Sequence, residues 1–300
     1  MTSSSASRSG FTLVELLVVI GIVALLIAIL LPSLSAARQQ ALSVANLSNM
    51  RQLGLGLEMY RNDAQGRFPQ HSSLKDNTTN VGLPRTRWAD ALYPYVESEA
   101  VFLAPQLTDD ELIARMRKPF AHTVEANPGG SPVETDDTVY YGGYGYNYQY
   151  LGNSRTAGGS LNAYAATAAT VSDPSNTVAF ADTKGARDGD PTLPYGHGGS
   201  GVYVVDPPLH SVELGSRGSR KNADPVTADD ASGNAAYEGG DAMTDDVRAT
   251  PAARNKETHV GITWADGHGS LLTPEQLDDR DGDGEPDNGY WNGRGDSTRR

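Results

Sequence analysis

Three residues near the amino terminus have types and spacing that would allow a charge pair if the chain were cut between the first two of them. Gly10 and Phe11 begin an apolar run, and Glu15 is the one charged side chain between Phe11 and Leu31. If the chain is cut after Gly10, the freed amine of Phe11 is largely cationic at neutral pH. About one helical turn separates that amine from Glu15. We therefore expect the carboxylate to be neutralised by the amine of its own chain or of a neighbouring one.

An acidic stretch near the carboxyl terminus has the spacing of a calcium loop. Its carboxylates occupy positions 1, 3, 5 and 9, Gly284 stands at the turning position 6, and a backbone carbonyl is available at position 7. Position 12 is Tyr290, so the bidentate glutamate of a full EF-hand is missing. The alternative is a solvated acidic tail that binds no metal. The candidate calcium ligands are Asp279, Asp281, Asp283, Glu285 and Asp287.

The other titratable residues do not form the signature of an enzyme or a zinc site. The histidines of the carboxyl-terminal half are not spaced as a zinc motif, and the chain has no cysteine. No Gly-x-Ser-x-Gly element stands between a strand and a helix to present a nucleophile. We therefore expect no catalytic residue and no required cofactor, with Ca²⁺ as the one candidate metal. The histidines concerned are His197, His210, His259 and His268.

The apolar run is long enough to span a membrane as a helix. At about 1.5 Å of rise per residue, residues 11–31 extend over about 31 Å, and the hydrocarbon layer of a bilayer is about 30 Å thick. A secretory signal peptide has a shorter apolar region and more positive charge before it, although Ser35-Ala36-Ala37 is a weak cleavage site. An uncleaved anchor accounts for the length but not for the placement of Gly10, Phe11 and Glu15.

The stretch SRSGFTLVELLVVIGIVALLIAILLPSL resembles the amino-terminal signature of type IV pilins and type II secretion pseudopilins. In that family a prepilin peptidase cleaves after the glycine, the new phenylalanine is N-methylated, and the fifth mature residue is a glutamate that guides subunit assembly. The resemblance implies that Gly10 and Phe11 are the processing residues and that Glu15 is the assembly residue. Pro32 also falls where the long helix of the family often has a proline.

Composition favours an exported head domain without disulfides. The chain of 300 residues carries a net charge of −13, which argues against a nucleic-acid partner because phosphate-binding proteins normally present basic surfaces.

Arg8 precedes the span and the acidic residues follow it, so the amino terminus is expected in the cytoplasm and the head in the periplasm.

The helix is expected to continue beyond the membrane over Ser33 to Tyr60 and to end between Asp63 and Pro69. Its apolar residues recur at steps of three or four, which predicts one stripe packed on the head. Gly54 and Gly56 lower helix propensity, so the last turns depend on tertiary contacts. The predicted stripe comprises Leu34, Ala37, Ala41, Val44, Ala45, Leu47, Met50, Leu53, Leu57 and Tyr60, with Arg38, Gln39, Ser43, Asn49 and Arg51 on other faces.

The head is predicted to combine short helices with antiparallel strands. Asp266-Gly267 between apolar segments predicts a hairpin, and Thr273-Pro274 predicts a capped helix after it. The stretch Val139 to Tyr150 is expected to be a strand or an aromatic loop. Tyrosines at strand spacing more often lie in the core or on a sheet surface, and the alternative is an exposed set that stacks on sugars. The other predicted elements are helices at Arg87–Val96, with Trp88, Leu92 and Tyr95 inward, and at Thr108–Met116, strands at Thr177–Asp182, Gly201–Asp206 and His259–Trp264, and loops at Gly185–Gly199 and Leu214–Thr258.

Several head segments extend the resemblance to a bacterial group of pseudopilin-like proteins that carry a carboxyl-terminal H-X9-DG domain. These segments are ANLSNMRQLGLGLEMYRNDAQGRFPQ, WADALYPYVESEAVFLAP, YGYNYQYLG, DPSNTVAFADT and HVGITWADGHGSLL. The sequence departs from the pattern that gives the group its name. Lys256 stands ten residues before Asp266, where the pattern has histidine, and His259 lies closer to it.

These observations predict an α+β, pilin-like protein whose long helix packs on an antiparallel sheet. The expected function is structural: an inner-membrane, single-pass subunit, processed by prepilin peptidase, that assembles with other pilin or pseudopilin subunits into a pseudopilus or pilus. The machine that contains this subunit could be a secretion system, a pilus or a DNA-uptake apparatus. The alternative function is that of a membrane-anchored glycan- or ligand-binding module outside the cytoplasm. The predicted divisions are residues 1–10 (leader), 11–31 (membrane and assembly helix), 32–62 (amphipathic continuation), 63–272 (head) and 273–300 (acidic tail with the calcium loop).

Overall fold

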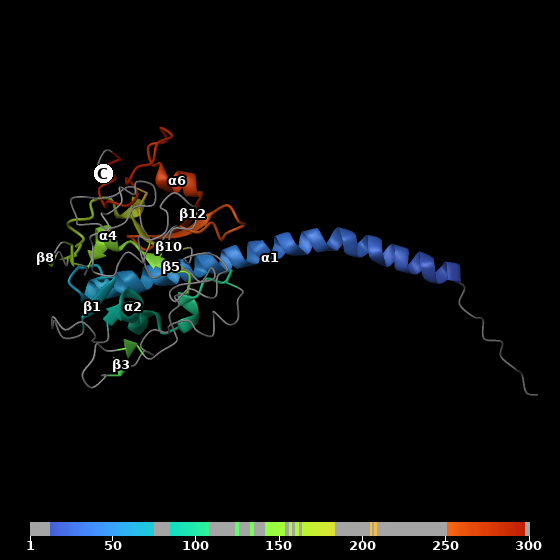
Figure 1. Cartoon of the computed structure of the whole chain (residues 1–300), viewed down its shortest axis with the longest axis horizontal. Helices are drawn as coiled ribbons and strands as arrows, with labels where there is room; N and C mark the ends of the chain where they lie inside the picture. Colours follow the sequence, from blue (N-terminus) through green and yellow to red (C-terminus); the bar gives the residue numbers. More distant parts are fainter. Residues whose placement is uncertain are drawn as a thin grey trace, which may run out of the picture. The chain divides into compact units, whose positions relative to one another are not determined.

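The computed structural model describes residues 13–74, 85–107, 124–125, 133–134, 142–153, 156–157, 160–161, 164–183, 205, 207–208 and 251–297. The chain divides into two units, Met1–Ala41 and Leu42–Arg300, and each is described by itself. Helix α1, Leu13–Asp63, contributes residues to both units (Figure 1).

Helix α1 is continuous through the proline that the sequence placed at its apolar-to-polar boundary. Pro32 lies inside the helix, where it removes one backbone N–H. The hydroxyl of Ser33 donates to the carbonyl of Leu30 at 2.8 Å, so a side chain supplies a hydrogen bond in the same turn. The helix ends where predicted, because Asp63 is followed by a turn in which Gly66 adopts a left-handed φ of 79°.

The buried face of α1 is more polar than the sequence pattern predicted. Met50 is fully buried as expected, but Leu34 and Val44 of the predicted stripe are 67% and 57% exposed. The placement of Ser43 on an outer face was also wrong, because its side chain is buried together with Asn46. Asn46 is accepted in the core because its amide is hydrogen bonded to partners from the head. The buried residues of α1 are Ser43, Asn46, Met50, Leu53, Gly54, Gly56 and Leu57.

A four-stranded antiparallel sheet forms the centre of the head, with the strand order β12-β11-β10-β5. The two central strands are buried throughout, which matches their nearly continuous apolar sequences. The predicted hairpin is confirmed, since β11 and β12 pair across the Asp266-Gly267 turn. An α+β arrangement is therefore confirmed. The strands are β5 (Tyr144–Tyr146), β10 (Val178–Asp182), β11 (Val260–Trp264) and β12 (Gly269–Leu272).

The sheet is covered on both faces by hydrophobic clusters. One cluster joins Phe180 and the tyrosines of β5 to α1 and to helix α2, Trp88–Val96. The other joins Ile262 and Trp264 to the carboxyl-terminal segment. An irregularity in the pairing of β10 with β11, between Val178 and Phe180, places Ala179 and Phe180 in the same cluster.

The short helix α2 confirms the prediction for this stretch, with one correction. Trp88 and Leu92 are buried against the core, as predicted. Tyr95 is only partly buried, and its hydroxyl donates to the carboxylate of Asp63 at 3.0 Å. The prediction that Tyr95 points inward was therefore wrong, because the phenol finds a polar partner at the end of α1.

The remaining elements are short. The helix predicted after Thr273 is confirmed, with the side chain of Thr273 and that of Gln276 forming a capping box. The predictions at Thr108–Met116, at Gly185–Gly199 and for most of Gly201–Asp206 and Leu214–Thr258 fall outside the described residues. The other elements are β1 (Ser72–Leu74), β2 (Arg85–Arg87), η1 (Glu99–Phe102), β3 (Val124–Glu125), β4 (Val133–Glu134), α4 (Tyr148–Leu151), β6 (Gly152–Asn153), β7 (Thr156–Ala157), β8 (Ser160–Leu161), β9 (Tyr164–Ala165), η2 (Pro174–Asn176) and α6 (Pro274–Asp278).

Candidate functional site

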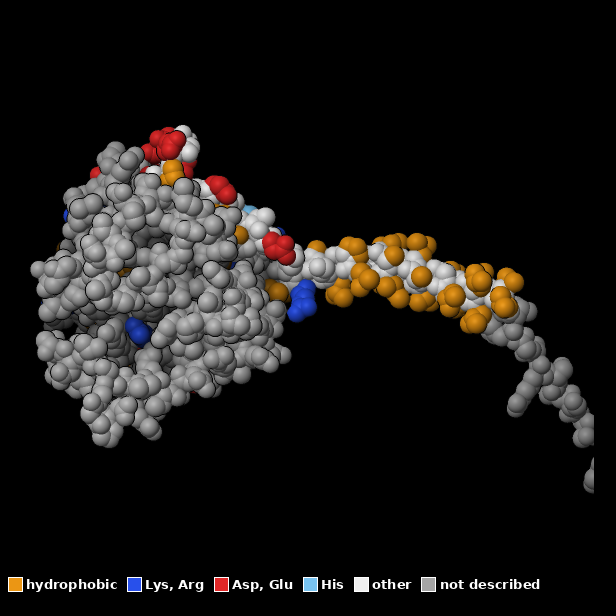
Figure 2. All heavy atoms as spheres, in the orientation of Figure 1, with side chains coloured by type: hydrophobic (Ala, Val, Ile, Leu, Met, Phe, Trp, Pro, Cys, Tyr) orange, Lys and Arg blue, Asp and Glu red, His pale blue; other side chains and the backbone are white. Residues whose placement is uncertain are grey.

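The amino-terminal part of α1 is apolar on every side. Between Leu13 and Leu31 the large hydrophobic side chains are 47 to 76% exposed, and Figure 2 shows them along this segment. A helix that is hydrophobic all round requires a membrane or other helices as its surroundings. Within the described residues, α1 is the one helix that is long and apolar enough to cross a membrane, a property that signal sequences share.

Glu15 lies in the first turn of α1, and its side chain is exposed. A carboxylate in the first turn is stabilised by the N–H groups and the dipole of the helix terminus. The other two predicted residues of this site, Gly10 and Phe11, lie outside the described residues. The structure therefore places Glu15 at the start of the apolar helix and leaves its distance to Phe11 undefined.

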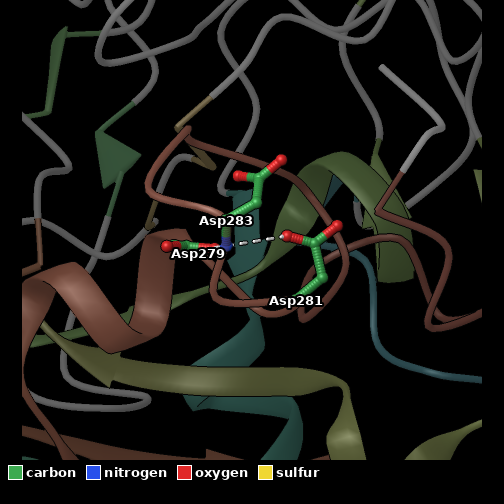
Figure 3. A group of neighbouring side chains, drawn as sticks. All are labelled: Asp279, Asp281 and Asp283. Atoms are coloured by element: carbon green, nitrogen blue, oxygen red, sulfur yellow. Dashed lines mark hydrogen bonds between the residues drawn. The ribbon is translucent and has the colours of Figure 1, made fainter.

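The acidic loop brings three of its five predicted ligands together. One carboxylate oxygen from each of Asp279, Asp281 and Asp283 lies within 4.8 Å of the others, around the turn shown in Figure 3. Glu285 and Asp287 do not join this group. Carboxylate oxygens are ligands that hard cations prefer, and Ca²⁺ would need further oxygens from backbone carbonyls or water to reach its usual six to eight.

Two aspartates of the loop hold its backbone in shape. Asp279 accepts hydrogen bonds from the N–H groups of Gly282 and Gly284 at 2.7 and 2.9 Å. Asp287 is 5% exposed and accepts from the N–H of Arg280 at 2.8 Å, closing the loop from its far end. The carboxylate of Asp287 is therefore committed to the fold of the loop, which is why it stands apart from the group of three.

The cation within the loop is directed away from these three aspartates. The guanidinium of Arg280 donates to the carboxylate of Asp173 at 2.7 Å and to the carbonyl of Gly289 at 3.1 Å. It also lies 5.4 Å from the centre of the Tyr290 ring. Arg280 thus fixes the loop to the head and leaves the charge of the aspartate group to solvent or to a bound cation.

The carboxyl-terminal segment that follows the hairpin is anchored in the core by buried residues on both sides of the acidic loop. Leu277 and Trp291 are fully buried beneath the sheet. The carbonyl of Trp291 accepts from the side chain of Asn147 at 3.0 Å, and the N–H of Val178 donates to the carbonyl of Tyr290 at 2.8 Å. The acidic loop is therefore displayed from a packed segment rather than from a free tail.

The tyrosines considered as a sugar-binding surface are part of the core. Tyr144, Tyr146, Tyr148 and Tyr150 are at most 9% exposed. The hydroxyl of Tyr146 donates to the carbonyl of Pro69 at 2.7 Å. These four rings therefore belong to the core, which is the arrangement that tyrosines at strand spacing favour, and they do not form an exposed stacking surface.

Two of the histidines lie in the carboxyl-terminal element but in different surroundings. His268 contacts Asp266 at 2.6 Å between Nδ1 and Oδ1, and its ring stacks on Trp264 at 5.6 Å. The Nδ1 of His259 is 2.8 Å from the hydroxyl of Thr258. His197 and His210 lie outside the described residues.

A buried polar node that the sequence did not indicate joins α1 to the sheet. We call the side chains of Asn46, Tyr144, Asp182 and Asn255, with the backbone N–H of Gly261, the Asp182 node. Asp182 is fully buried at the end of β10, and burial raises its pKa to about 7 against the opposing effect of Arg254 and the donors. The only sequence signal was Asp182 itself, a charged residue at the end of an apolar strand. Charged residues at strand ends are usually exposed, so this signal did not indicate a buried carboxylate.

Comparison with known protein families agrees with the amino-terminal motif. The model of a family described as "Prokaryotic N-terminal methylation motif" matches residues 5–31. No curated protein and no solved structure matches the chain. The matched stretch contains Gly10, Phe11 and Glu15 and points to a structural subunit rather than an enzyme. The chain therefore carries, at residues 5–31, the amino-terminal motif of type IV pilin-like substrates of prepilin peptidase.

Proposed function

We propose that this protein is a structural subunit of a pseudopilus or pilus. Prepilin peptidase removes residues 1–10, the amine of Phe11 is methylated, and α1 then packs with the helices of other subunits. The observation that carries this proposal is the methylation motif at residues 5–31, in which residues 13–31 form a helix that is apolar on all sides. Before assembly the bilayer covers that surface, and after assembly neighbouring helices cover it.

Glu15 provides the selectivity of this packing in our proposal. Placing a carboxylate in the hydrocarbon layer costs about 3 kcal/mol on insertion scales, unless a positively charged partner offsets this cost. The amine of Phe11 on a neighbouring subunit is a cation that only processed chains possess. Pairing between Glu15 and that amine would therefore restrict assembly to cleaved subunits.

The proposed orientation places the amino terminus in the cytoplasm and the head in the periplasm, with α1 as a single span of the inner membrane. Arg8 before the span and the acidic residues after it support this orientation. The β11–β12 hairpin is proposed to be a degenerate form of the H-X9-DG element, because Asp266-Gly267 is retained while Lys256 replaces the histidine.

Calcium binding at the acidic loop is a second proposal, supported by the group formed by Asp279, Asp281 and Asp283. The loop is attached to the core through Trp291 and Arg280. A bound cation would thus stabilise the head, which has no disulfide to do so.

Amino-terminal sequencing and intact mass of the protein from its native membrane test the main proposal. A chain that begins at an N-methylated Phe11 is expected. A chain that keeps Met1, or that begins beyond Leu31 after trimming by signal peptidase, would overturn the proposal. Cross-linking between subunits in the same membranes separates a filament subunit from an anchored glycan- or ligand-binding module, which would bind its ligand without contacts between subunits.

A further inference from the structure

The Asp182 node joins α1 to three other segments of the head through the side chains of Asn46 and Asp182. The amide of Asn46 donates to Oδ2 of Asp182 at 2.8 Å, and its carbonyl accepts from the hydroxyl of Tyr144 at 2.6 Å. Asn255 donates to the same carboxylate oxygen at 2.9 Å, and the N–H of Gly261 donates to it at 2.7 Å. The node thus ties α1 to β5, to β10 and to the segment that leads into β11.

The two oxygens of the Asp182 carboxyl group have very different surroundings. Oδ2 accepts three hydrogen bonds, whereas Oδ1 is buried and has no hydrogen-bond partner among the residues that the structure describes. An ionised carboxylate in this position leaves one charged oxygen buried without a donor from these residues, which is costly. A proton on Oδ1 removes the charge and leaves all three hydrogen bonds to Oδ2 in place.

The ionisable groups around the node do not fully offset this cost. Arg254, next to Asn255, favours the ionised carboxylate, but burial of Asp182 is the larger effect and raises its pKa to about 7. The phenol of Tyr144 is itself buried, and its pKa is raised well above its ordinary value, so it remains neutral. From α1 and β11, the described residues that contact the carboxylate, Asn46 and Gly261, are uncharged donors.

We propose that Asp182 is a proton-dependent latch between α1 and the sheet. The node is closed when the carboxyl group holds a proton, and it loosens when the proton is lost. When the node loosens, water can reach Oδ1 of Asp182. The movement weakens the hydrogen bonds that Asn46, Asn255 and Gly261 donate to Oδ2. The latch would set how firmly residues 42–63 of α1 are held to the sheet of the head.

The direction of the pH dependence follows from proton linkage. In the open form, Asp182 is hydrated and has an ordinary pKa near 3.8, whereas in the closed form its pKa is about 7. The closed form therefore binds more protons between these two values. Its advantage over the open form is greatest below about pH 4, declines as the pH rises toward about 7, and is constant above that.

Hydrogen exchange of the full chain in detergent micelles tests the latch. The amides of residues 42–57, 178–183 and 255–264, after correction for intrinsic exchange, are expected to lose up to about tenfold of protection per pH unit between about pH 4.5 and 7. The variant Asp182→Asn resembles the protonated state and should keep its protection across this range. The matched control Asp63→Asn changes an exposed carboxylate at the end of α1 and should behave like the wild type.

The proposal is overturned if the hydrogen exchange of the Asp182→Asn variant varies with pH as that of the wild type does. If that variant does not fold, infrared spectroscopy of the wild type takes its place, because a protonated carboxyl group has its own carbonyl stretch. A carboxyl band that disappears near neutral pH supports the latch, and the absence of any carboxyl group titrating above about pH 5.5 contradicts it.

Discussion

Gly54 of α1 lies against the backbone of Gly267 in the β11–β12 turn. A Cβ atom on Gly54 would stand 2.1 Å from the carbonyl oxygen of Gly267, and Gly267 itself has a left-handed φ of 89°. The helix and the hairpin can approach this closely because neither glycine has a side chain at the contact. The two residues together fix the position of the hairpin on the helix.

Replacing Gly54 by alanine should therefore destabilise the head. Alanine improves helix propensity by about 1 kcal/mol, but the backbone of the turn must move to admit its methyl group, at a cost of about 1 to 3 kcal/mol or more. Urea unfolding of the full chain in detergent measures the difference. Gly21→Ala is the matched control, because its Cβ meets nothing within 4 Å. Equal stability of the two variants would show that the contact is loose.

Processing depends on Gly10 in our proposal. A bulky residue such as valine at this position should block cleavage, so that the protein in the membrane retains residues 1–10 and lacks a methylated Phe11. Mass spectrometry of membrane extracts measures both. Gly21→Ala again serves as the control, since it changes a glycine of the same apolar stretch and should be processed normally. Mature protein of normal size from the Gly10 variant would contradict the assignment.

Glu15 should be required for assembly but not for cleavage. Glu15→Ala removes the carboxylate, and Glu15→Gln keeps the shape of the side chain while removing its charge. Both variants should yield mature protein that enters filaments poorly, because the amine of Phe11 on a neighbour loses its counter-charge. Quantifying the subunit in sheared filaments against the subunit in membranes measures the effect. Normal incorporation of Glu15→Gln would exclude charge pairing as the basis of assembly.

Local sequence signals predicted the elements of the head well where the signal and the structure act over the same few residues. The Asp266-Gly267 turn and the capping box at Thr273 are of this kind, since turn and cap chemistry operate between near neighbours. The glycines of α1 were correctly expected to depend on tertiary contact. Their partners, such as Gly267, could not be predicted because they lie far along the chain.

The Asp182 node shows the limit of periodicity as a guide. Ser43 and Asn46 are polar, so the helical pattern placed the packed stripe elsewhere and included Val44, which is exposed. Only the partners brought by the folded sheet, Tyr144 and Asp182, make it favourable to bury Asn46. Asp287 was predicted only as a metal ligand, and the sequence did not indicate that its carboxylate also accepts hydrogen bonds from backbone N–H groups of its loop.

Calcium should stabilise the head through the group formed by Asp279, Asp281 and Asp283. At a concentration about 100 times the dissociation constant, binding would raise the free energy of unfolding by about 2.7 kcal/mol, and a chelator should reverse the gain. Asp281→Asn should weaken this response, because it removes one carboxylate from the group. It should not change the stability without calcium, because the side chain of Asp281 is exposed. Asp287→Asn provides the contrast: it should destabilise the head with and without calcium while keeping the calcium-dependent increment. Thermal unfolding of wild type and both variants in calcium and in chelator measures each quantity, and a wild-type transition that is identical in the two solutions would show that the loop is a solvated acidic surface.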